Sequence, residues 1–263
     1  MNSKQAIGIF DSGVGGLSIW NEITTLLPHE RTIYLADSKN APYGQKSKQT
    51  IIEFSIKNTE LLIEKGCKII VVACNTATTN AIDYLRSHYK IPFIGIEPAI
   101  KPAALQTKTN SIGILATKGT LSSALFHSTS KEFTEEILVI EQVGEGLVPL
   151  IESGRIESIE MKNLLKKYLN PMLKKNIDYL VLGCSHYPFL ILQIKNILGN
   201  KVQIIDSGEA VAKQTKMILQ KNNLLYKGTS IPKHLLFGNA NIDTLKKLAN
   251  NLNKKCLISY LDF

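Results

Sequence analysis

The sequence has few cysteines and no long hydrophobic run, and both absences narrow the class of protein. Its four cysteines, Cys67, Cys74, Cys184 and Cys256, are too few and too widely spaced for a disulfide scaffold in 263 residues. They form no CxxC pair, so zinc and dithiol redox motifs are absent. No apolar run approaches the ~20 residues of a membrane span, and the start, MNSKQAIGIFDSG, lacks a signal-peptide pattern. We expect a cytoplasmic protein with no membrane partner, whose cysteines are core residues or reactive thiols.

Acidic residues are fewer than basic ones, 22 against 31, which gives a formal net charge of +9. Such a surplus invites a nucleic-acid interpretation. The lysines argue against it, because they fall on stretches with helical spacing and no aromatic residues are interleaved to stack on bases. Examples are Lys162, Lys166, Lys167, Lys174 and Lys175. We predict a solvated basic face and no nucleic-acid partner.

Short apolar runs bounded by turn residues alternate with helical patterns, which is typical of βαβ units and a parallel sheet. The runs expected to be strands are residues 6–10, 32–36, 68–73, 92–96, 111–116, 137–143, 178–183 and 202–205. The pattern therefore predicts an α/β fold. Eight strands in a chain of this length also suit a TIM barrel, so the pattern alone leaves that alternative open.

An internal repeat favours two similar domains. AIGIFDSGVGGL at residue 6 resembles SIGILATKGTL at residue 111, and the runs that end at Cys74 and Cys184 repeat at an offset of 110. Two open sheets that face each other would bring both cysteines to one cleft, a common ligand site. We predict two open, mostly parallel α/β domains related by pseudo-symmetry, with the active site between them. The domains are residues 1–97 with 208–263, whose tail returns to the first half, and residues 98–207.

Two of the cysteines stand where buried strands are expected to end. Cys74 and Cys184 each follow a β-branched apolar run, and open α/β sheets bind ligands at the carboxyl ends of their strands. Asn75 and Thr76 begin a helix directly after Cys74, so we expect that helix N-terminus to lower the pKa of the thiol. His186 lies two residues beyond Cys184 and is placed to serve as its proton partner.

A glycine-rich loop, DSGVGG at residues 11–16, follows the first expected strand. A dinucleotide loop of the form GxGxxG would need glycine at Ser18 and would place Asp11 beside the pyrophosphate. Two other interpretations suit the residues better. The loop is a tight strand-to-helix turn, or its amides and Ser12 hold an anion while Asp11 acts in the chemistry.

Six short motifs are spread over almost the whole chain: FDSGVGGLS, APYG, ACNTAT, ATKGT, VPLIESG and GCSHYPF. In order and spacing they resemble the bacterial glutamate racemases, cofactor-independent enzymes of the aspartate/glutamate racemase superfamily. Two positions depart from the usual pattern, Ser185 for threonine and Phe189 for leucine. Serine keeps the hydroxyl, so we expect substrate binding to be retained.

The resemblance implies that the chain interconverts L- and D-glutamate for peptidoglycan synthesis, without cofactor or metal, and that it forms a homodimer. It implies that Cys74 deprotonates D-glutamate and Cys184 deprotonates L-glutamate. The residues that it implies as their acidic and basic partners are Asp11, His186 and Glu152. The substrate contacts that it implies are Asp11, Ser12, Tyr43, Gly44, Asn75, Thr76, Thr117, Thr120, Ser185 and His186.

Racemisation removes the α-proton from one face of the substrate and returns a proton to the other, so it needs two proton carriers on opposite sides of one carbon. Two matched thiols meet that need. An aspartate racemase would use much of the same machinery. A cysteine hydrolase would use Cys184 and His186 but leave Cys74 without a role. A two-lobed binding protein would need neither thiol, and a pair of core cysteines would have no chemistry.

Overall fold

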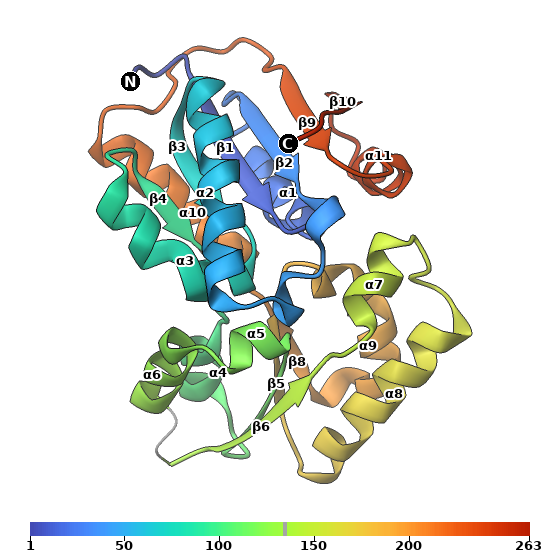
Figure 1. Ribbon diagram of the computed structural model, residues 1–263. Helices are drawn as coiled ribbons and strands as arrows, with labels where there is room; N and C mark the ends of the chain where they lie inside the picture. The colour runs from blue at the N-terminus through green and yellow to red at the C-terminus, as the bar shows by residue number, and fades with distance from the viewer. Residues whose placement is uncertain (134–135) are drawn as a thin grey trace.

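The chain forms two open, parallel β-sheets, each with helices on both faces (Figure 1). The computed structural model describes residues 1–133 and 136–263. The first sheet has the strand order β10-β9-β2-β1-β3-β4 and the second β6-β5-β7-β8, and neighbouring strands pair in parallel. The prediction of two open sheets is confirmed. The TIM-barrel alternative is wrong, because among the described residues neither sheet closes on itself.

We call each sheet with its helices a domain. The strands of the first domain are β1 (Ala6–Asp11), β2 (Thr32–Ala36), β3 (Cys67–Val72), β4 (Phe93–Gly95), β9 (His234–Gly238) and β10 (Cys256–Tyr260). Its helices are α1 (Leu17–Leu26), α2 (Lys48–Glu64), α3 (Asn75–His88), α10 (Gly208–Lys221) and α11 (Asp243–Asn250). Two short 3-10 turns, η1 (Ser38–Asn40) and η2 (Tyr43–Gln45), lie between β2 and α2.

The second domain contains the remaining elements. Its strands are β5 (Ser111–Ala116), β6 (Leu138–Val143), β7 (Tyr179–Gly183) and β8 (Gln203–Ile205). Its helices are α4 (Ile100–Gln106), α5 (Lys118–Leu121), α6 (Ala124–Phe133), α7 (Leu147–Glu152), α8 (Ile159–Lys174) and α9 (Ile191–Leu198), with 3-10 turns η3 (Tyr187–Leu190) and η4 (Gly199–Lys201).

Burial on both faces explains the uninterrupted apolar runs of the central strands. Along β3, Ile69 and Val71 pack into a core shared with α1 and α10, whereas Ile70 and Val72 pack into a core shared with α2 and α3. All four side chains are fully buried. A strand between two helical layers needs apolar side chains at every position rather than at alternate ones.

The internal repeat is visible in the topology. The order β2-β1-β3-β4 in the first sheet matches β6-β5-β7-β8 in the second, strand for strand in sequence order. Cys74 follows β3 after one residue, and Cys184 follows β7 directly. The two cysteines therefore occupy equivalent strand ends in the two sheets.

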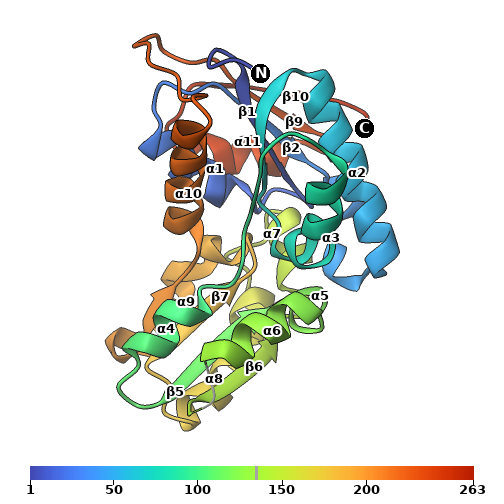
Figure 2. The ribbon, with the colours of Figure 1, turned by 90° about the vertical axis from the view of Figure 1, so that its left-hand side faces the viewer.

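The tail returns to the first domain, as expected. Strand β9 pairs with β2, and β10 extends the same sheet, although neither strand was among the eight that the pattern predicted. The eight predicted strands are all present, and their ends agree within one residue. The chain passes between the domains twice, and Ser207 Oγ donates a hydrogen bond to the carbonyl of Glu97 where these passages lie side by side (Figure 2). The boundaries at residues 97 and 208 stay a prediction.

A buried ion pair ties the tail and the amino terminus to the sheet. Lys68 on β3 is fully buried, and its Nζ lies 2.5 Å from Glu30 Oε2 and 2.7 Å from the carbonyl oxygen of Ser3. The other oxygen of Glu30 accepts a hydrogen bond of 2.8 Å from the amide of Tyr226.

None of the helices in residues 1–133 and 136–263 combines the length and the hydropathy that a membrane span needs.

We predict that Lys68→Met lowers the free energy of unfolding by about 3–5 kcal/mol, because it leaves Glu30 buried without its cation. Adding Glu30→Gln should recover part of the loss, since the uncompensated charge is then gone. Urea titration followed by circular dichroism measures both. Lys57→Met, on the exposed face of α2, is the control and should change stability by no more than about 0.5 kcal/mol. An equally small effect of Lys68→Met would contradict the stabilising role of the pair.

Candidate active site

The carboxyl ends of the two sheets face one cavity, and both strand-end cysteines line it. Its lining residues are Ser12, Pro42, Tyr43, Gly44, Cys74, Asn75, Thr76, Thr117, Val148, Cys184, Ser185 and His186. Most of the site residues expected from the sequence are in this set. Asp11, Glu152 and Thr120 are not, and they contact the lining residues from behind.

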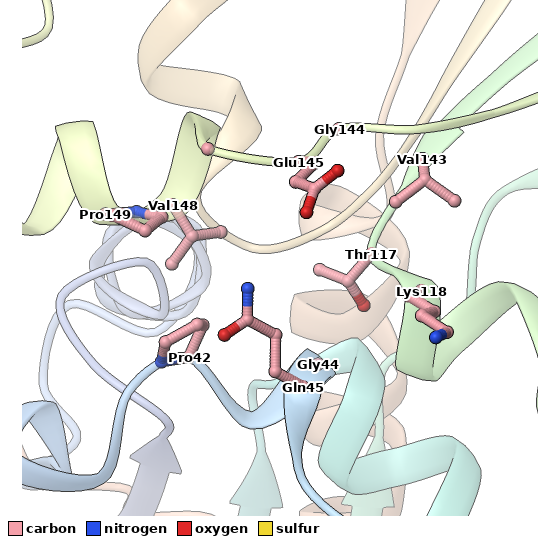
Figure 3. Close-up of a pocket in the computed structure, with 11 residues that line it drawn as sticks. Pro42, Gly44, Gln45, Thr117, Lys118, Val143, Gly144, Glu145, Val148 and Pro149 are labelled. Carbon is pink, nitrogen blue, oxygen red and sulfur yellow. The ribbon is translucent and has the colours of Figure 1, made fainter.

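The cavity is closed around the thiols. Its volume is about 10 Å³, and Cys74 and Cys184 are only 4% and 6% exposed. Pro42, Gly44, Thr117 and Val148 also line an adjoining cavity of about 280 Å³ (Figure 3). The smaller cavity has room for about one water molecule, so it must widen before an amino acid can enter it.

Cys74 forms the N-cap of α3. Its Sγ lies 3.4 Å from the amide nitrogen of Ala77, which donates to it, and 3.5 Å from Ser12 Oγ. Burial raises the pKa of this thiol well above its ordinary value, and the negative charge of Asp11 raises it further. Contacts with Ser12 and Ala77 act in the opposite direction but are weaker. The Ala77 amide at the helix N-terminus lowers the pKa of Cys74, as expected, but desolvation outweighs it and leaves the pKa of the thiol above its ordinary value.

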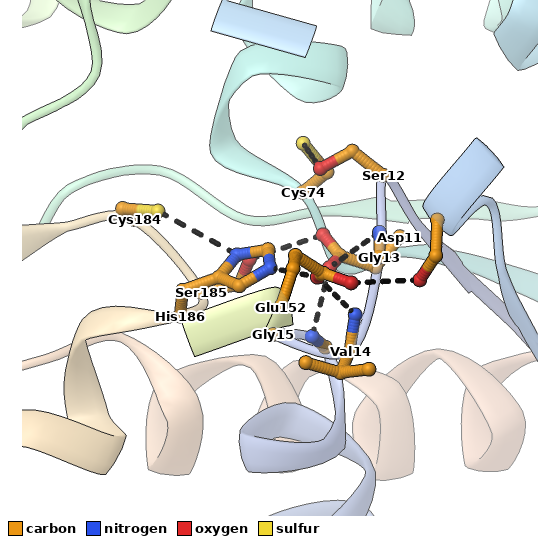
Figure 4. A network of polar contacts seen from close by, with 12 residues as sticks. Asp11, Ser12, Gly13, Val14, Gly15, Cys74, Glu152, Cys184, Ser185 and His186 are labelled. Carbon is orange, nitrogen blue, oxygen red and sulfur yellow. Dashed lines mark hydrogen bonds and ion pairs between the residues drawn. The ribbon is translucent and has the colours of Figure 1, made fainter. Parts of the chain in front are cut away.

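Cys184 has a cationic neighbour. Its Sγ lies 3.8 Å from His186 Nδ1, and His186 Nε2 lies 2.5 Å from Glu152 Oε1 (Figure 4). Burial by itself would lower the pKa of His186, but hydrogen bonds to Cys184 and Glu152 and the charges of Glu152 and Asp11 raise it well above its ordinary value. The protonated imidazole thus places a positive charge beside the Cys184 sulfur. The expected pairing of His186 with Cys184 is present in the geometry.

Glu152, the last residue of α7, connects the two domains. Besides pairing with His186, its carboxylate accepts hydrogen bonds of 2.7 Å from the amide of Val14 and 2.8 Å from Ser38 Oγ. Burial favours the neutral acid, but the contacts with His186, Val14 and Ser38 outweigh it and lower the pKa of Glu152. Glu152 and His186 thus form an ion pair in which His186 is buried and Glu152 is partly buried.

Asp11 lies beneath the cavity and is completely buried. Its carboxylate accepts hydrogen bonds of 3.2 Å and 3.0 Å from the amides of Gly13 and Gly16, and 3.0 Å from Ser185 Oγ of the second domain. Burial raises the pKa of Asp11, although the positive His186 opposes the rise. Among the described residues Asp11 makes no hydrogen bond to Cys74, so it acts on that thiol through its charge.

The glycine-rich loop is shaped by contact between domains rather than by a ligand. A Cβ atom at Gly13 would lie 1.9 Å from Glu152 Oε1, and one at Gly15 would lie 2.2 Å from His186 Nδ1. The amides of Gly13 and Gly16 donate to Asp11, and the amide of Val14 donates to Glu152. These contacts support the tight-turn interpretation and not a dinucleotide-binding loop, whereas the Ser12 side chain lines the cavity and is placed to meet an anionic group.

Polar groups from both domains surround the thiols. The hydroxyls of Thr76 and Thr117 lie 2.7 Å apart across the domain interface, and Thr120 lies behind them, 3.0 Å from Thr117. Asn75 is 2% exposed, and neither Oδ1 nor Nδ2 of its side chain has a hydrogen-bond partner in the described part of the chain. An unpaired buried amide costs free energy, so a polar ligand in the cavity would be its natural partner.

Several contributors were not found from the sequence. Ser38 holds Glu152, and Ser18 Oγ donates a 2.9 Å hydrogen bond to the carbonyl of Ser185. Asp37 accepts a 2.5 Å hydrogen bond from the hydroxyl of Tyr43. Of these, Asp37 could have been identified from the sequence, because it directly follows β2 and therefore lies at the same sheet edge as the cysteines. Within residues 1–133 and 136–263, no cluster of three or more His, Cys, Asp or Glu residues suits a metal ion.

Comparison with known proteins agrees with this geometry. The family described as Asp/Glu/Hydantoin racemase matches residues 17–215. The glutamate racemase of Herpetosiphon aurantiacus is 46% identical over 226 residues, covering 86% of this chain and 89% of that protein. Escherichia coli glutamate racemase, solved with L-glutamate and the activator UDP-MurNAc-Ala, has a TM-score of 0.87 at 32% identity over 98% of both chains. The Francisella tularensis enzyme, solved with D-glutamate, has a TM-score of 0.84 at 29% identity over 99% and 98%.

We predict that Glu152→Gln lowers the pKa of His186, because it removes the charge that favours the imidazolium. Nitrogen-15 NMR of histidine-labelled protein, titrated with pH, follows the imidazole directly, and His186→Asn assigns its signal. In the parent protein His186 should stay protonated through neutral pH. Glu145→Gln, in the same domain but outside the ion pair, should leave the titration unchanged. A His186 that is neutral at pH 7 in the parent would contradict the assigned ion pair.

Proposed function

The chain belongs to the Asp/Glu/hydantoin racemase family, and we propose that it interconverts L-glutamate and D-glutamate by α-proton transfer between Cys74 and Cys184. The observation that carries this proposal is the position of the two thiols. They follow equivalent strands of two repeated sheets and line one closed cavity. Two proton carriers that approach one carbon from different domains are what inversion at that carbon requires.

The direction from L- to D-glutamate begins with Cys184 as thiolate and Cys74 as thiol. Cys184 takes the α-proton, and Cys74 donates its proton to the opposite face of the same carbon. The reverse direction begins with the opposite protonation states. Burial and the charge of Asp11 favour the protonated form of Cys74, which is the proton donor in the first arrangement.

The carbanionic transition state needs electrostatic stabilisation, which is strongest where water is excluded. Asn75, Ser12 and Ser185 line the closed cavity and offer an amide and hydroxyls to the carboxylates and the ammonium group of glutamate. The unpaired amide of Asn75 supports a polar ligand here. Because the cavity is far smaller than glutamate, binding includes a separation of the domains and closure around the substrate.

We also propose a use for the product, a location and an oligomeric state. D-glutamate from this reaction would supply peptidoglycan synthesis. We place the enzyme in the cytoplasm, where its four free cysteines would stay reduced. The active form would be a homodimer, and sedimentation equilibrium measures its mass.

Thr117 would contact substrate at the cavity wall, whereas Thr120 would hold Thr117 and Thr76 from behind.

We predict that Cys74→Ser and Cys184→Ser each reduce glutamate racemisation by roughly 100-fold or more, since a serine hydroxyl is a far weaker acid than a thiol and each variant loses one proton carrier. Circular dichroism of L- or D-glutamate incubated with the protein, with no cofactor added, measures the rate. Cys256→Ser, a half-buried cysteine outside the cavity, is the matched control and should keep the parent rate.

Undiminished racemisation by either cavity variant would sink the two-thiol mechanism. A parent protein that racemises aspartate and not glutamate would instead identify an aspartate racemase. A parent that racemises neither, and that hydrolyses an amide or ester substrate only while Cys184 is intact, would identify a cysteine hydrolase.

A further inference from the structure

The segment Asp37–Gln45 contributes to both halves of the site. It connects β2 to α2, and its residues Pro42, Tyr43 and Gly44 line the cavity that contains the thiols. At its beginning, Ser38 donates the hydrogen bond to Glu152 of the second domain. The position of this segment therefore affects both the wall of the cavity and the ion pair beside Cys184.

The buried carboxylate of Asp37 holds the segment in place. One of its oxygens accepts a 2.5 Å hydrogen bond from the hydroxyl of Tyr43, and the other accepts a 2.8 Å hydrogen bond from Asn40 Nδ2. Asn58 of α2 also donates to the Tyr43 hydroxyl, at 3.2 Å. Burial raises the pKa of Asp37, while these donors oppose the rise. The carboxylate thus depends on its donors, since a buried charge without them would be costly.

Asn239 supplies a donor to this carboxylate from the tail. It follows β9 at the same sheet edge, is 2% exposed, and donates a 2.5 Å hydrogen bond from Nδ2 to Asp37 Oδ1. The same nitrogen donates at 3.0 Å to the carbonyl of Phe263, and Oδ1 accepts at 2.9 Å from the amide of Lys39. All the polar groups of this amide are therefore used, and they join three separate stretches of chain.

We infer that Asn239 is a positioning residue for the substrate cavity, which it serves by fixing the Asp37 carboxylate that orients Tyr43. The inference rests on the proposed racemase function for its kinetic consequences. Through Asn239, the tail supports the cavity wall in addition to extending the first sheet. An asparagine suits the position because it donates to a carboxylate and accepts from a backbone amide at once. A leucine of similar size would do neither, and an aspartate would place a second carboxylate against Asp37.

The test is Asn239→Asp, which keeps the size of the side chain and changes its charge. Asn241→Asp, an exposed position two residues away, is the matched control. At neutral pH two carboxylates would repel each other across the 2.5 Å contact, so KM for L-glutamate should rise about tenfold, with a smaller change in kcat. As the pH falls, the two carboxyl groups share a proton, as paired acids do, and KM should return toward that of the parent.

The groups around this pair are few and can be followed separately. Tyr43 faces Asp37 and also feels the charges of Asp11 and Cys74, and Lys39 pairs with Asp262 on the tail. The control carries the same added charge, so a general effect of charge on glutamate binding would appear in both variants. A rise in KM that depends on pH only in Asn239→Asp assigns the effect to the contact with Asp37.

Two further measurements keep the inference falsifiable. Hydrogen exchange of segment Asp37–Gln45, followed by mass spectrometry without substrate, should be faster in Asn239→Asp than in the control, and equal exchange would overturn the inference whether or not the protein racemises glutamate. If Asn239→Asp does not fold, Asn239→Ser combined with Tyr43→Phe completes a double-mutant cycle. Non-additive effects on KM support action through Tyr43, and additive effects overturn it. A parent that racemises glutamate while Asn239→Asp keeps the parent KM at all pH values sinks this inference alone.

Discussion

The arrangement of the site depends on the contacts that the Glu152 carboxylate makes. It pairs with His186 in its own domain and accepts hydrogen bonds from Val14 and Ser38 in the other. One partly buried charge therefore bridges the domains and keeps a cation beside Cys184. The same contact explains why glycine is needed at position 13, where any side chain would overlap the carboxylate.

The two domains repeat one fold, but the charges beside their equivalent cysteines differ. Each thiol stands at the carboxyl end of the third strand of its repeat, and both are buried in the shared cavity. Cys74 has the negative Asp11 nearby, whereas Cys184 has the positive His186. The pseudo-symmetry thus brings two thiols from different domains to one cavity, and their charged neighbours differ in sign.

Local patterns in the sequence were enough to predict the eight strands of the repeat and the convergence of Cys74 and Cys184, because parallel strands place their exits at one edge. The sign of the pKa shift at Cys74 was not predictable in the same way. It depends on how completely two domains exclude water, and desolvation there exceeds the influence of the helix amides. Asn239 was missed for another reason. It follows a strand, β9, whose mixed burial gives a weaker pattern than the fully buried runs, and its partners lie far away in the sequence.

We propose that two different groups move the proton on the two faces of glutamate. Racemisation of unlabelled L-glutamate in deuterium oxide tests it most directly, with mass spectrometry of the separated enantiomers during the first few per cent of conversion. We expect the D-glutamate formed to carry one solvent deuterium at the α-carbon, because Cys74, equilibrated with solvent, delivers it. D-glutamate that retains the original α-proton would show that one group moves it between the faces, and would rule out the two-thiol mechanism.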